Sequence, residues 1–322
     1  MKGYRTKDKT NSNRKQQERK KNMHFNVKED IIQMTSQWKG ERFPDGRPRV
    51  PDEYLKALHG LTLEEVWKPI FVKGYESQFE GELKYLHQDG RKLIGRAVTA
   101  TYCPARPDLN ETVAEIGKSE GRTGTYNQWV VDSLVEGDVC VVDMYDKIYK
   151  GTFLGGNLTT AIANRTKTGG GVIWGGIRDL EQMKQVQNVQ VYYRGIDPTP
   201  IREFIMTGFN TPTRIGKAVC LPGDIVFGTD AGVLFIPAHL VQEVVDGAVK
   251  TKVKDMFGFE MITQNKFTTA QIDRNVWTVE MLDLLTEYIN TNEAAADFRG
   301  IDWSAEYDLA IHGDPNDTQS AI

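Results

Sequence analysis

Arg178 and Asp179 stand side by side directly after an apolar run, residues 171–174, that predicts a buried strand. A planar guanidinium group presents several donors to a carboxylate or a developing enolate oxygen, and a carboxylate is a hard oxygen ligand for Mg²⁺ or Mn²⁺. A glycine turn at residues 155–157 comes earlier in the sequence, and a helical pattern starts at Leu158. Because the first turn of a helix leaves its amide groups unpaired, this turn could hold a substrate carboxylate.

The same residue types also allow a purely structural interpretation. The glycines would then only permit close packing, and Arg178 and Asp179 would form a surface ion pair at the end of a strand. Residue types alone give the two interpretations equal weight, so the elements that position these residues matter.

A strand, a turn, a helix and a second strand surround these residues. The first strand covers residues 139–143, the turn residues 154–157 and the helix residues 158–165, with apolar positions spaced for one face. Glycines 169 to 171 end the helix, and the strand at 171–174 leads into Arg178 and Asp179. This α/β unit therefore carries a cation and a carboxylate side by side at the exit of its last strand.

The flanking sequence predicts further strands and helices. Strand patterns occur at residues 93–102, where Gly95 would be a bulge and Pro104 the end, and at 189–194. Three short strands with tight turns indicate a second, more β-rich layer, at residues 218–221, 225–228 and 232–237. Helices are expected from Thr62, which has Glu65 three residues later, and over 127–135, 238–254 and 269–289.

Composition and charge narrow the function classes. The chain has 322 residues, of which 39% are apolar, enough for a sizeable core in one or two domains. The net charge of −4 is unevenly spread, because residues 1–22 carry +7 and the remainder −11. An acidic folded part is a poor match for nucleic acid, so none is expected as a partner of the folded core. The Lys/Arg/Asn/Gln-rich segment 1–22 is expected to be a disordered tail.

Cysteine usage and hydropathy indicate a cytoplasmic protein. The three cysteines, Cys103, Cys140 and Cys220, are widely spaced, as expected for free thiols in a reducing compartment. None of the five histidines forms a recognisable pattern with them, which argues against a cysteine nucleophile. No run reaches the roughly 18 apolar residues of a membrane span, and the basic N-terminus lacks the apolar segment of a secretory signal. No membrane partner is expected.

Four separated motifs carry a resemblance to a known family. They lie at residues 137–143, 154–158 and 170–179, and in the turn at 222–224 that leads to 230–233. In order and spacing, over about residues 93–245, they resemble the RraA-like family. That family includes metal-dependent 4-hydroxy-4-methyl-2-oxoglutarate and 4-carboxy-4-hydroxy-2-oxoadipate aldolases with oxaloacetate decarboxylase activity. It also includes the protein regulator of RNase E that names the family.

The resemblance implies an α/β/β/α swivelling-type domain, here with helical N- and C-terminal extensions, assembled as a homotrimer or a dimer of trimers. It implies a class II-type pyruvate aldolase or decarboxylase, a lyase that cleaves a carbon–carbon bond of a small 2-oxo acid and releases pyruvate. By the family's motif, Arg178 would hold the pyruvyl group and Asp179 would bind Mg²⁺ or Mn²⁺. The implied substrate-binding set is Gly155, Gly156, Asn157, Leu158 and Arg178.

Asn157 departs from the family's pattern. The family has an acidic residue there, with twenty residues between it and the motif arginine, that supports water on the metal. An amide can orient water but cannot take its proton, so the implied catalytic pair of Arg178 and Asn157 lacks a base for aldol cleavage. Decarboxylation of oxaloacetate removes no proton, and the change therefore favours decarboxylation or an aldolase whose base lies elsewhere. Three nearby carboxylates are expected to be surface charges in preference to that base: Asp143, Asp146 and Glu181.

Two other functions compete with the lyase. The first is a non-catalytic protein-interaction regulator resembling the RNase E inhibitor, for which the basic tail and Asn157 are circumstantial support. The regulator branch of the family has lost the metal-binding aspartate, whereas Asp179 is present here, which favours the enzyme. The second, an old description of the family as a menaquinone-pathway methyltransferase, finds no support, because no glycine-rich loop followed by an acidic ribose ligand occurs.

The expected domain order follows from these ranges. It is a disordered basic tail at 1–22, a helical N-terminal extension at 23–90, an RraA-like catalytic domain at 91–250, and a helical C-terminal extension with a polar tail at 251–322. The extensions could cover the site or widen contacts between subunits. Trp174, inside an apolar strand beside the motif, is expected in the core.

Overall fold

The computed structural model describes residues 26–313. Internal contacts divide the chain into two compact units: the first takes residues up to 55 together with 77–239, and the second takes 56–76 together with the chain from residue 240. Residues 56–76 belong to the second unit, where they pack with the C-terminal helices. The expected tails, at 1–22 and from 314, lie outside the described residues.

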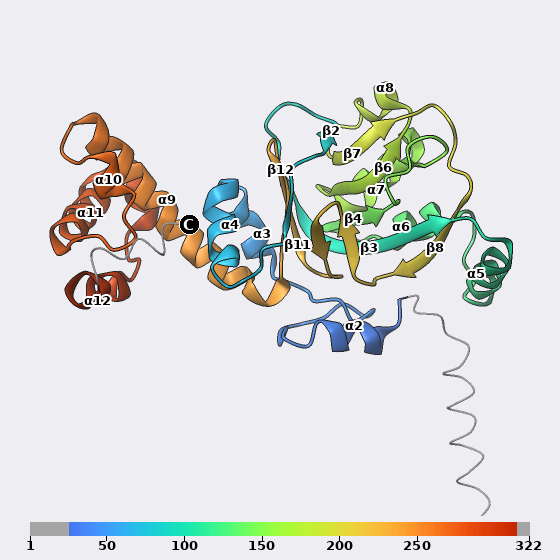
Figure 1. Ribbon diagram of the computed structural model, residues 1–322, viewed down its shortest axis with the longest axis horizontal. Helices are drawn as coiled ribbons and strands as arrows, with labels where there is room; N and C mark the ends of the chain where they lie inside the picture. The colour runs from blue at the N-terminus through green and yellow to red at the C-terminus, as the bar shows by residue number, and fades with distance from the viewer. Residues whose placement is uncertain (1–25, 314–322) are drawn as a thin grey trace, which may run out of the picture. The chain divides into compact units, whose positions relative to one another are not determined.

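The first unit is built on one ten-stranded mixed sheet (Figure 1). Its parallel centre consists of β3 (Leu93–Pro104), β4 (Asp138–Asp143), β6 (Gly170–Ile177) and β7 (Gln190–Ile196), with β5 (Thr152–Leu154) parallel to β6. Antiparallel strands complete it: β11 (Ile225–Thr229), β12 (Gly232–Ile236), β1 (Phe79–Glu80), β8 (Phe204–Phe209) and β2 (Lys84–Tyr85). Because β4 and β6 are parallel neighbours, their carboxyl ends lie at the same edge of the sheet.

Alternating side chains of β4 enter two different cores. Cys140 and Val142 belong to the core on the side of the helices, which are α5 (Pro107–Ser119), α6 (Tyr126–Ser133), α7 (Gly156–Thr166) and α8 (Leu180–Met183). Val139 and Val141 belong to the opposite core, with residues of β11 and β12 and of a small sheet formed by β9 (Thr213–Ile215) and β10 (Ala218–Cys220). The fold is therefore mixed α/β with helices on one face and strands over the other. The expected second β-rich layer is present, although β11 and β12 belong to the same sheet as β3.

The second unit is helical. It contains α4 (Leu63–Phe71), α9 (Val241–Thr263), α10 (Thr269–Ile272), α11 (Val279–Thr291), α12 (Ser304–His312) and a 3₁₀ segment, η2 (Glu293–Phe298). Its core is lined by Val253, Phe257, Trp277 and Leu285. Within residues 26–313, none of the helices is long and apolar enough to cross a bilayer. The remaining helical pieces are α2 (Lys28–Met34), α3 (Asp52–Leu58) and the 3₁₀ segment η1 (Ala238–Leu240).

Some expected elements are confirmed and others are wrong. The capping box at Thr62 and Glu65 begins α4 as predicted. The single helix expected over 269–289 is wrong, because α10 ends at Ile272 and the Thr278 side chain accepts a hydrogen bond from the Met281 amide to begin α11. The bulge expected at Gly95 is also wrong, since the pairing of β3 shifts between Thr101 and Tyr102 instead.

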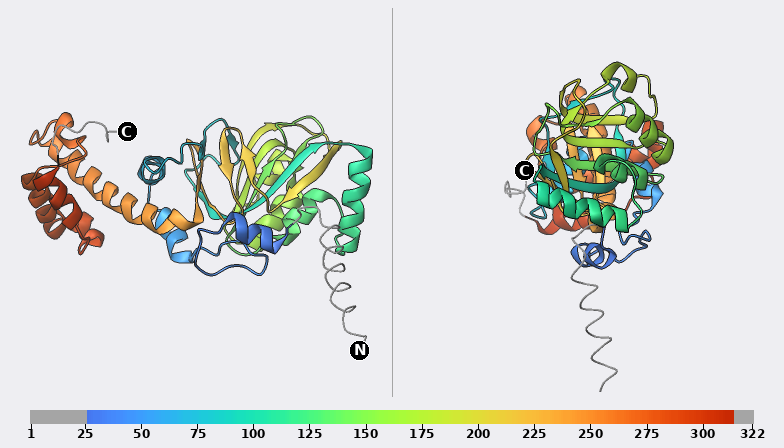
Figure 2. Two further views of the ribbon diagram at one scale, coloured as in Figure 1. Left: turned by 60° about the horizontal axis from the view of Figure 1, so that its bottom comes forward. Right: turned by 90° about the vertical axis from the view of Figure 1, so that its right-hand side faces the viewer.

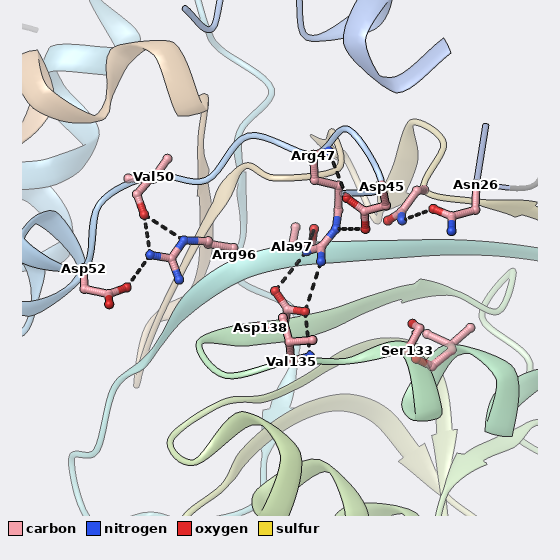
Figure 3. Close-up of polar contacts among 12 residues, drawn as sticks. Asn26, Asp45, Arg47, Val50, Asp52, Arg96, Ala97, Ser133, Val135 and Asp138 are labelled. Carbon is pink, nitrogen blue, oxygen red and sulfur yellow. Dashed lines mark hydrogen bonds and ion pairs between the residues drawn. The ribbon is translucent and has the colours of Figure 1, made fainter. Parts of the chain in front are cut away.

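A buried ion pair ties the N-terminal segment to the start of β4 (Figure 3). Arg47 donates to both carboxylate oxygens of Asp138, at 2.9 and 3.2 Å, and the two residues are 2% and 0% exposed. The Val135 amide also donates to Asp138. Burial raises the pKa of Asp138, although the charge of Arg47 opposes this shift. Two forked hydrogen bonds of this kind fix both the position and the orientation of the segment.

A second guanidinium group secures the same segment. Arg96 on β3 donates to the carbonyl of Val50 and contacts the carboxylate of Asp52 (Figure 3). Arg96 is 2% exposed. Residues upstream of the sheet are therefore part of the support for the first two parallel strands.

Removing Arg47 is expected to destabilise the protein strongly. Arg47→Met leaves the Asp138 carboxylate buried without a counter-charge, which costs about 3–5 kcal/mol. Arg49→Met is the matched control, because the Arg49–Glu41 pair is 49% and 70% exposed and such pairs contribute about 1 kcal/mol or less. Urea unfolding, followed by tryptophan fluorescence, measures the free energy of unfolding of both variants. Equal midpoint shifts for the two variants would contradict the importance of the buried pair.

Asp224 is a second buried carboxylate, and no cation among residues 26–313 forms an ion pair with it. It accepts hydrogen bonds from the amides of Leu221 and Ala238, at 2.8 and 3.3 Å, and is 5% exposed. Burial raises the pKa of Asp224 from 3.8 to about 7. The folded state therefore keeps a proton that the unfolded chain has already lost between about pH 4 and pH 7. The contribution of Asp224 to the free energy of unfolding is therefore present at low pH and is lost as the pH rises through that range.

Asp224→Asn should remove this pH dependence. The stability of the variant relative to the wild type is expected to rise between pH 4 and pH 7 by up to about 4 kcal/mol, given roughly 1.36 kcal/mol per pKa unit. Urea unfolding at several pH values measures the difference. Asp108→Asn is the control, because Arg106 lowers the pKa of that exposed carboxyl and its contribution has the opposite sign. If the stabilities of Asp224→Asn and the wild type change equally with pH, the raised pKa of Asp224 is refuted.

Candidate functional site

The glycine turn and the exit of β6 lie in close contact. Gly155 precedes the first residue of α7, and a Cβ there would lie 2.5 Å from Oδ2 of Asp179 and 3.2 Å from Cγ of Arg178. Arg178 donates its backbone N–H to the carbonyl of Leu154 over 2.9 Å. A glycine at position 155 is therefore required by the approach of the two turns and not by an unusual backbone angle.

Asp179 has a left-handed backbone conformation, with φ of +56°. Non-glycine residues adopt this conformation at a cost, and it is enriched at functional sites. Oδ2 of Asp179 accepts the N–H of Gly156 at the start of α7 over 3.2 Å, and Nε of Arg178 lies 3.7 Å from the same oxygen. The carboxylate therefore faces the first turn of a helix, where backbone N–H groups favour negative charge.

The ion pair that the structural interpretation expects is present, at a partly exposed position. The side chains of Arg178 and Asp179 are 41% and 34% exposed, and they face a cavity of about 170 Å³. Gly155, Asn157 and Leu158 line the same cavity. Gly156 is not part of the lining and contributes its N–H to Asp179. The structure thus brings the sequence-predicted residues together, while their chemical roles stay predictions.

The remaining wall comes from residues that sequence reasoning did not identify. They are Asn127, Thr152, Phe153, Gln182, Pro200 and Ile201. Asn127 is 5% exposed and donates to the carbonyl of Phe153 over 3.0 Å, which attaches α6 to β5. Thr152 donates to the carbonyl of Thr199 over 2.5 Å, which attaches the loop between β7 and β8. No local pattern marks these residues, because their partners lie elsewhere in the chain.

The neighbouring carboxylates do not line this cavity. Asp146 pairs with Nε of Arg194 over 3.0 Å and is 43% exposed. Asp143 was expected to be a surface charge, but its side chain is only 15% exposed and lies 3.6 Å from Nε of Arg214. Burial raises the pKa of Asp143. Trp174 lies in the core as expected, with the guanidinium group of Arg194 over its ring.

The cysteines are free thiols, as expected. Cys140 and Cys220 are fully buried, and burial raises the pKa of Cys140 to about 12 and that of Cys220 well above its ordinary value. Burial also raises the pKa of Cys103. A protonated thiol is a poor nucleophile, so these residues are not suited to attack a substrate.

The donor set of the cavity fits a cation that keeps most of its water. No group of three or more histidine, cysteine or acidic side chains able to hold a metal occurs among residues 26–313. Among the described residues, Asp179 is the only carboxylate in the lining of the cavity, and the neutral amides of Asn157 and Gln182 line it too. Mg²⁺ is commonly held by one or two carboxylates and completes its shell with water and substrate oxygens. Asp179 fits such a role.

The family model described as RraA-like, Aldolase/RraA, matches residues 68–235, and the chain belongs to this RraA-like family. Protein DlpA of Legionella pneumophila is 28% identical over 174 residues, which are 52% of this chain and 25% of that protein. The chain thus spans about a quarter of the length of this curated relative.

Solved structures share the fold. RraAS2 of Streptomyces coelicolor, described as an unusual member of the RNase ES inhibitor RraA protein family, aligns with a TM-score of 0.53 and 22% identity, over 66% of this chain and 97% of that one. A protein of Pseudomonas syringae pv. tomato aligns with a TM-score of 0.56 and 19% identity, over 72% and 98% of the respective chains. At these identities the likeness concerns the fold alone.

Proposed function

We propose that this protein is a divalent-metal-dependent lyase that cleaves a carbon–carbon bond of a 2-oxo acid and releases pyruvate. The observation that carries the proposal is that Arg178, Asp179 and the first turn of α7 face one small cavity. The family includes aldolases, which makes this chemistry available to the fold. Mg²⁺ or Mn²⁺ held by Asp179 would polarise the 2-oxo group as a Lewis acid.

Different residues of the cavity would bind different groups of the substrate. Arg178 provides the planar donors for the 2-oxo acid end and for the enolate oxygen that develops during cleavage. The amide groups at the start of α7 favour the carboxylate of the pyruvyl group. Asp179, beside them, is the hard oxygen ligand for the cation.

Asn157 favours decarboxylation among the reactions of this class. In oxaloacetate the bond between C3 and the C4 carboxylate breaks, its electron pair enters the pyruvate enolate, carbon dioxide leaves, and C3 then takes a proton from water. No base is needed before the bond breaks. Retro-aldol cleavage instead requires a base for the 4-hydroxyl group, and the Asn157 amide cannot serve as one.

Pyruvate release from oxaloacetate is expected to require metal and Asp179. Turnover should occur with Mg²⁺ or Mn²⁺, stop with EDTA, and fall about 100-fold or more in Asp179→Ala and Arg178→Met. Glu181→Gln removes an exposed carboxylate two residues from Asp179 and should leave turnover unchanged. A coupled lactate dehydrogenase assay on oxaloacetate and on 4-hydroxy-4-methyl-2-oxoglutarate measures both reactions.

The paired glycines offer a second test of the same site. In Gly155→Ala the new methyl group would displace the Asp179 carboxylate, and we expect at least a tenfold loss of kcat/KM. In Gly156→Ala the new atom meets only the Gln182 side chain, at 2.8 Å from Oε1 and 3.3 Å from Cβ, and the flexible end of that side chain can move aside. Turnover of oxaloacetate compares the activity of the two variants, and thermal melting compares their stability. Equal losses in the two variants would argue against a site organised around Asp179.

The second candidate is a non-catalytic regulator that binds another protein. Asp179 is the only carboxylate lining the cavity, and RraAS2 belongs by its description to a family of RNase inhibitors. Absence of turnover, together with no metal retained by the purified full chain, would favour this candidate.

We further propose a homotrimer or a dimer of trimers in the cytoplasm, because a second subunit could supply a further metal ligand. Sedimentation of the full chain tests the assembly.

A further inference from the structure

A larger cavity of about 550 Å³ adjoins the candidate site. It lies between α5, the start of α6 and the loop that joins β7 to β8, and α5 stands beside the start of β8 in Figure 1 and follows the end of β3 in the left view of Figure 2. Ile201 lines both cavities, and the neighbours Tyr126 and Asn127 line one each. The two cavities are therefore neighbours that share Ile201 as a lining residue.

An aromatic cluster forms part of the wall of the larger cavity. The rings of Tyr126 and Trp129 meet edge to face with centroids 4.9 Å apart, and Phe204 lies 6.3 Å from Tyr126. Trp129 and Phe204 are buried, so the rings are held by the core and not by solvent-facing contacts. Aromatic rings in such arrangements accept a further ring by stacking or edge contact. The wall therefore suits a flat apolar group.

The rim of this cavity carries cations without ion-pair partners. Lys118 and Arg202 are exposed and form no ion pair with residues 26–313, whereas Arg122 pairs with Glu120. The one acidic residue in the lining, Glu203, is paired with Lys150. An anionic group on a flat ligand would therefore find positive charge at the rim.

The loop that carries Ile201 is held in place by hydrogen bonds on both sides of this residue. Thr199 accepts the Lys150 amide at its hydroxyl over 2.7 Å. The Arg202 amide donates to the Lys150 carbonyl over 2.8 Å, and the Ala105 amide donates to the Glu203 carbonyl over 3.0 Å. A loop tied at this many points presents a preformed surface, which reduces the ordering cost of binding.

We propose that the larger cavity is the subsite for the distal half of the substrate and that it takes an aromatic group bearing a carboxylate. The inference rests on the proposed function, because the smaller cavity would hold the 2-oxo acid end of the same molecule. Such a substrate would pass over Ile201, which lines both cavities. The preferred substrate is therefore an aryl-substituted 2-oxo acid larger than oxaloacetate.

Unreactive oxamates test this inference without any need for turnover of the probe. Oxamate mimics the 2-oxo acid end, and N-phenylalkyl oxamates with one to three methylene groups carry a ring at increasing reach. Their affinity for the full chain is measured by calorimetry with Mg²⁺ present and by inhibition of oxaloacetate decarboxylation. We expect the best member to bind at least tenfold more tightly than oxamate, and its para-carboxylate derivative to bind more tightly still.

Three variants locate the ring and the charge. Ala114→Trp, on the face of α5 that lines the cavity, should abolish the gain from the ring while oxamate itself binds unchanged. Thr112→Trp places the same side chain on an exposed position of α5 outside the lining and should leave the gain intact. Arg202→Ala should remove only the extra gain from the para-carboxylate. Oxaloacetate turnover reports that each variant is folded.

The outcomes separate this inference from the proposed function. If no phenylalkyl oxamate binds more tightly than oxamate, or if Ala114→Trp and Thr112→Trp behave alike, the distal subsite is wrong even when oxaloacetate is turned over. If oxaloacetate is not turned over and oxamate does not bind, the proposed function fails and the subsite fails with it. Selective loss of the ring's gain in Ala114→Trp supports the subsite.

Discussion

The candidate site depends on the contact between two turns at one edge of the sheet. Parallel pairing of β5 with β6 sets Leu154 beside Ile177, and the next residue, Arg178, donates its N–H to the Leu154 carbonyl over 2.9 Å. The Asp179 carboxylate occupies the space that a side chain at position 155 would need. The guanidinium group, the carboxylate and the start of α7 are thus positioned by backbone hydrogen bonds of the sheet edge, with little dependence on long side chains.

Much of this edge could be predicted from the sequence because its signals are local. Strands buried on both faces produce continuous apolar runs, as at 139–143 and 170–177, and glycines mark the turns that follow. Parallel strand ends then bring Gly155 and Arg178 to one edge. Asn127 and Ile201 could not be found in this way, since each joins the cavity through hydrogen bonds and packing made by distant segments.

The wrong predictions concern residues whose pattern has more than one physical cause. The pattern predicts a bulge at Gly95, but a Cβ there would lie 2.7 Å from the carbonyl oxygen of Gly137. The glycine therefore permits β3 to approach the backbone just before β4 closely. Helical spacing continued through 273–278, yet the Thr278 cap begins a new helix there. Periodicity reports which side chains are buried and does not report where the backbone changes direction.

The N-terminal segment that carries Arg47 lies outside the matched family region. The matched family region begins at residue 68, whereas Arg47, Val50 and Asp52 lie before it. These three residues supply the counter-charge of Asp138 and the acceptors of Arg96, both inside the matched region. A fragment trimmed to the limits of sequence similarity would therefore retain two buried charges without their partners. The region matched by the family model therefore leaves out residues on which two of its own buried charges depend.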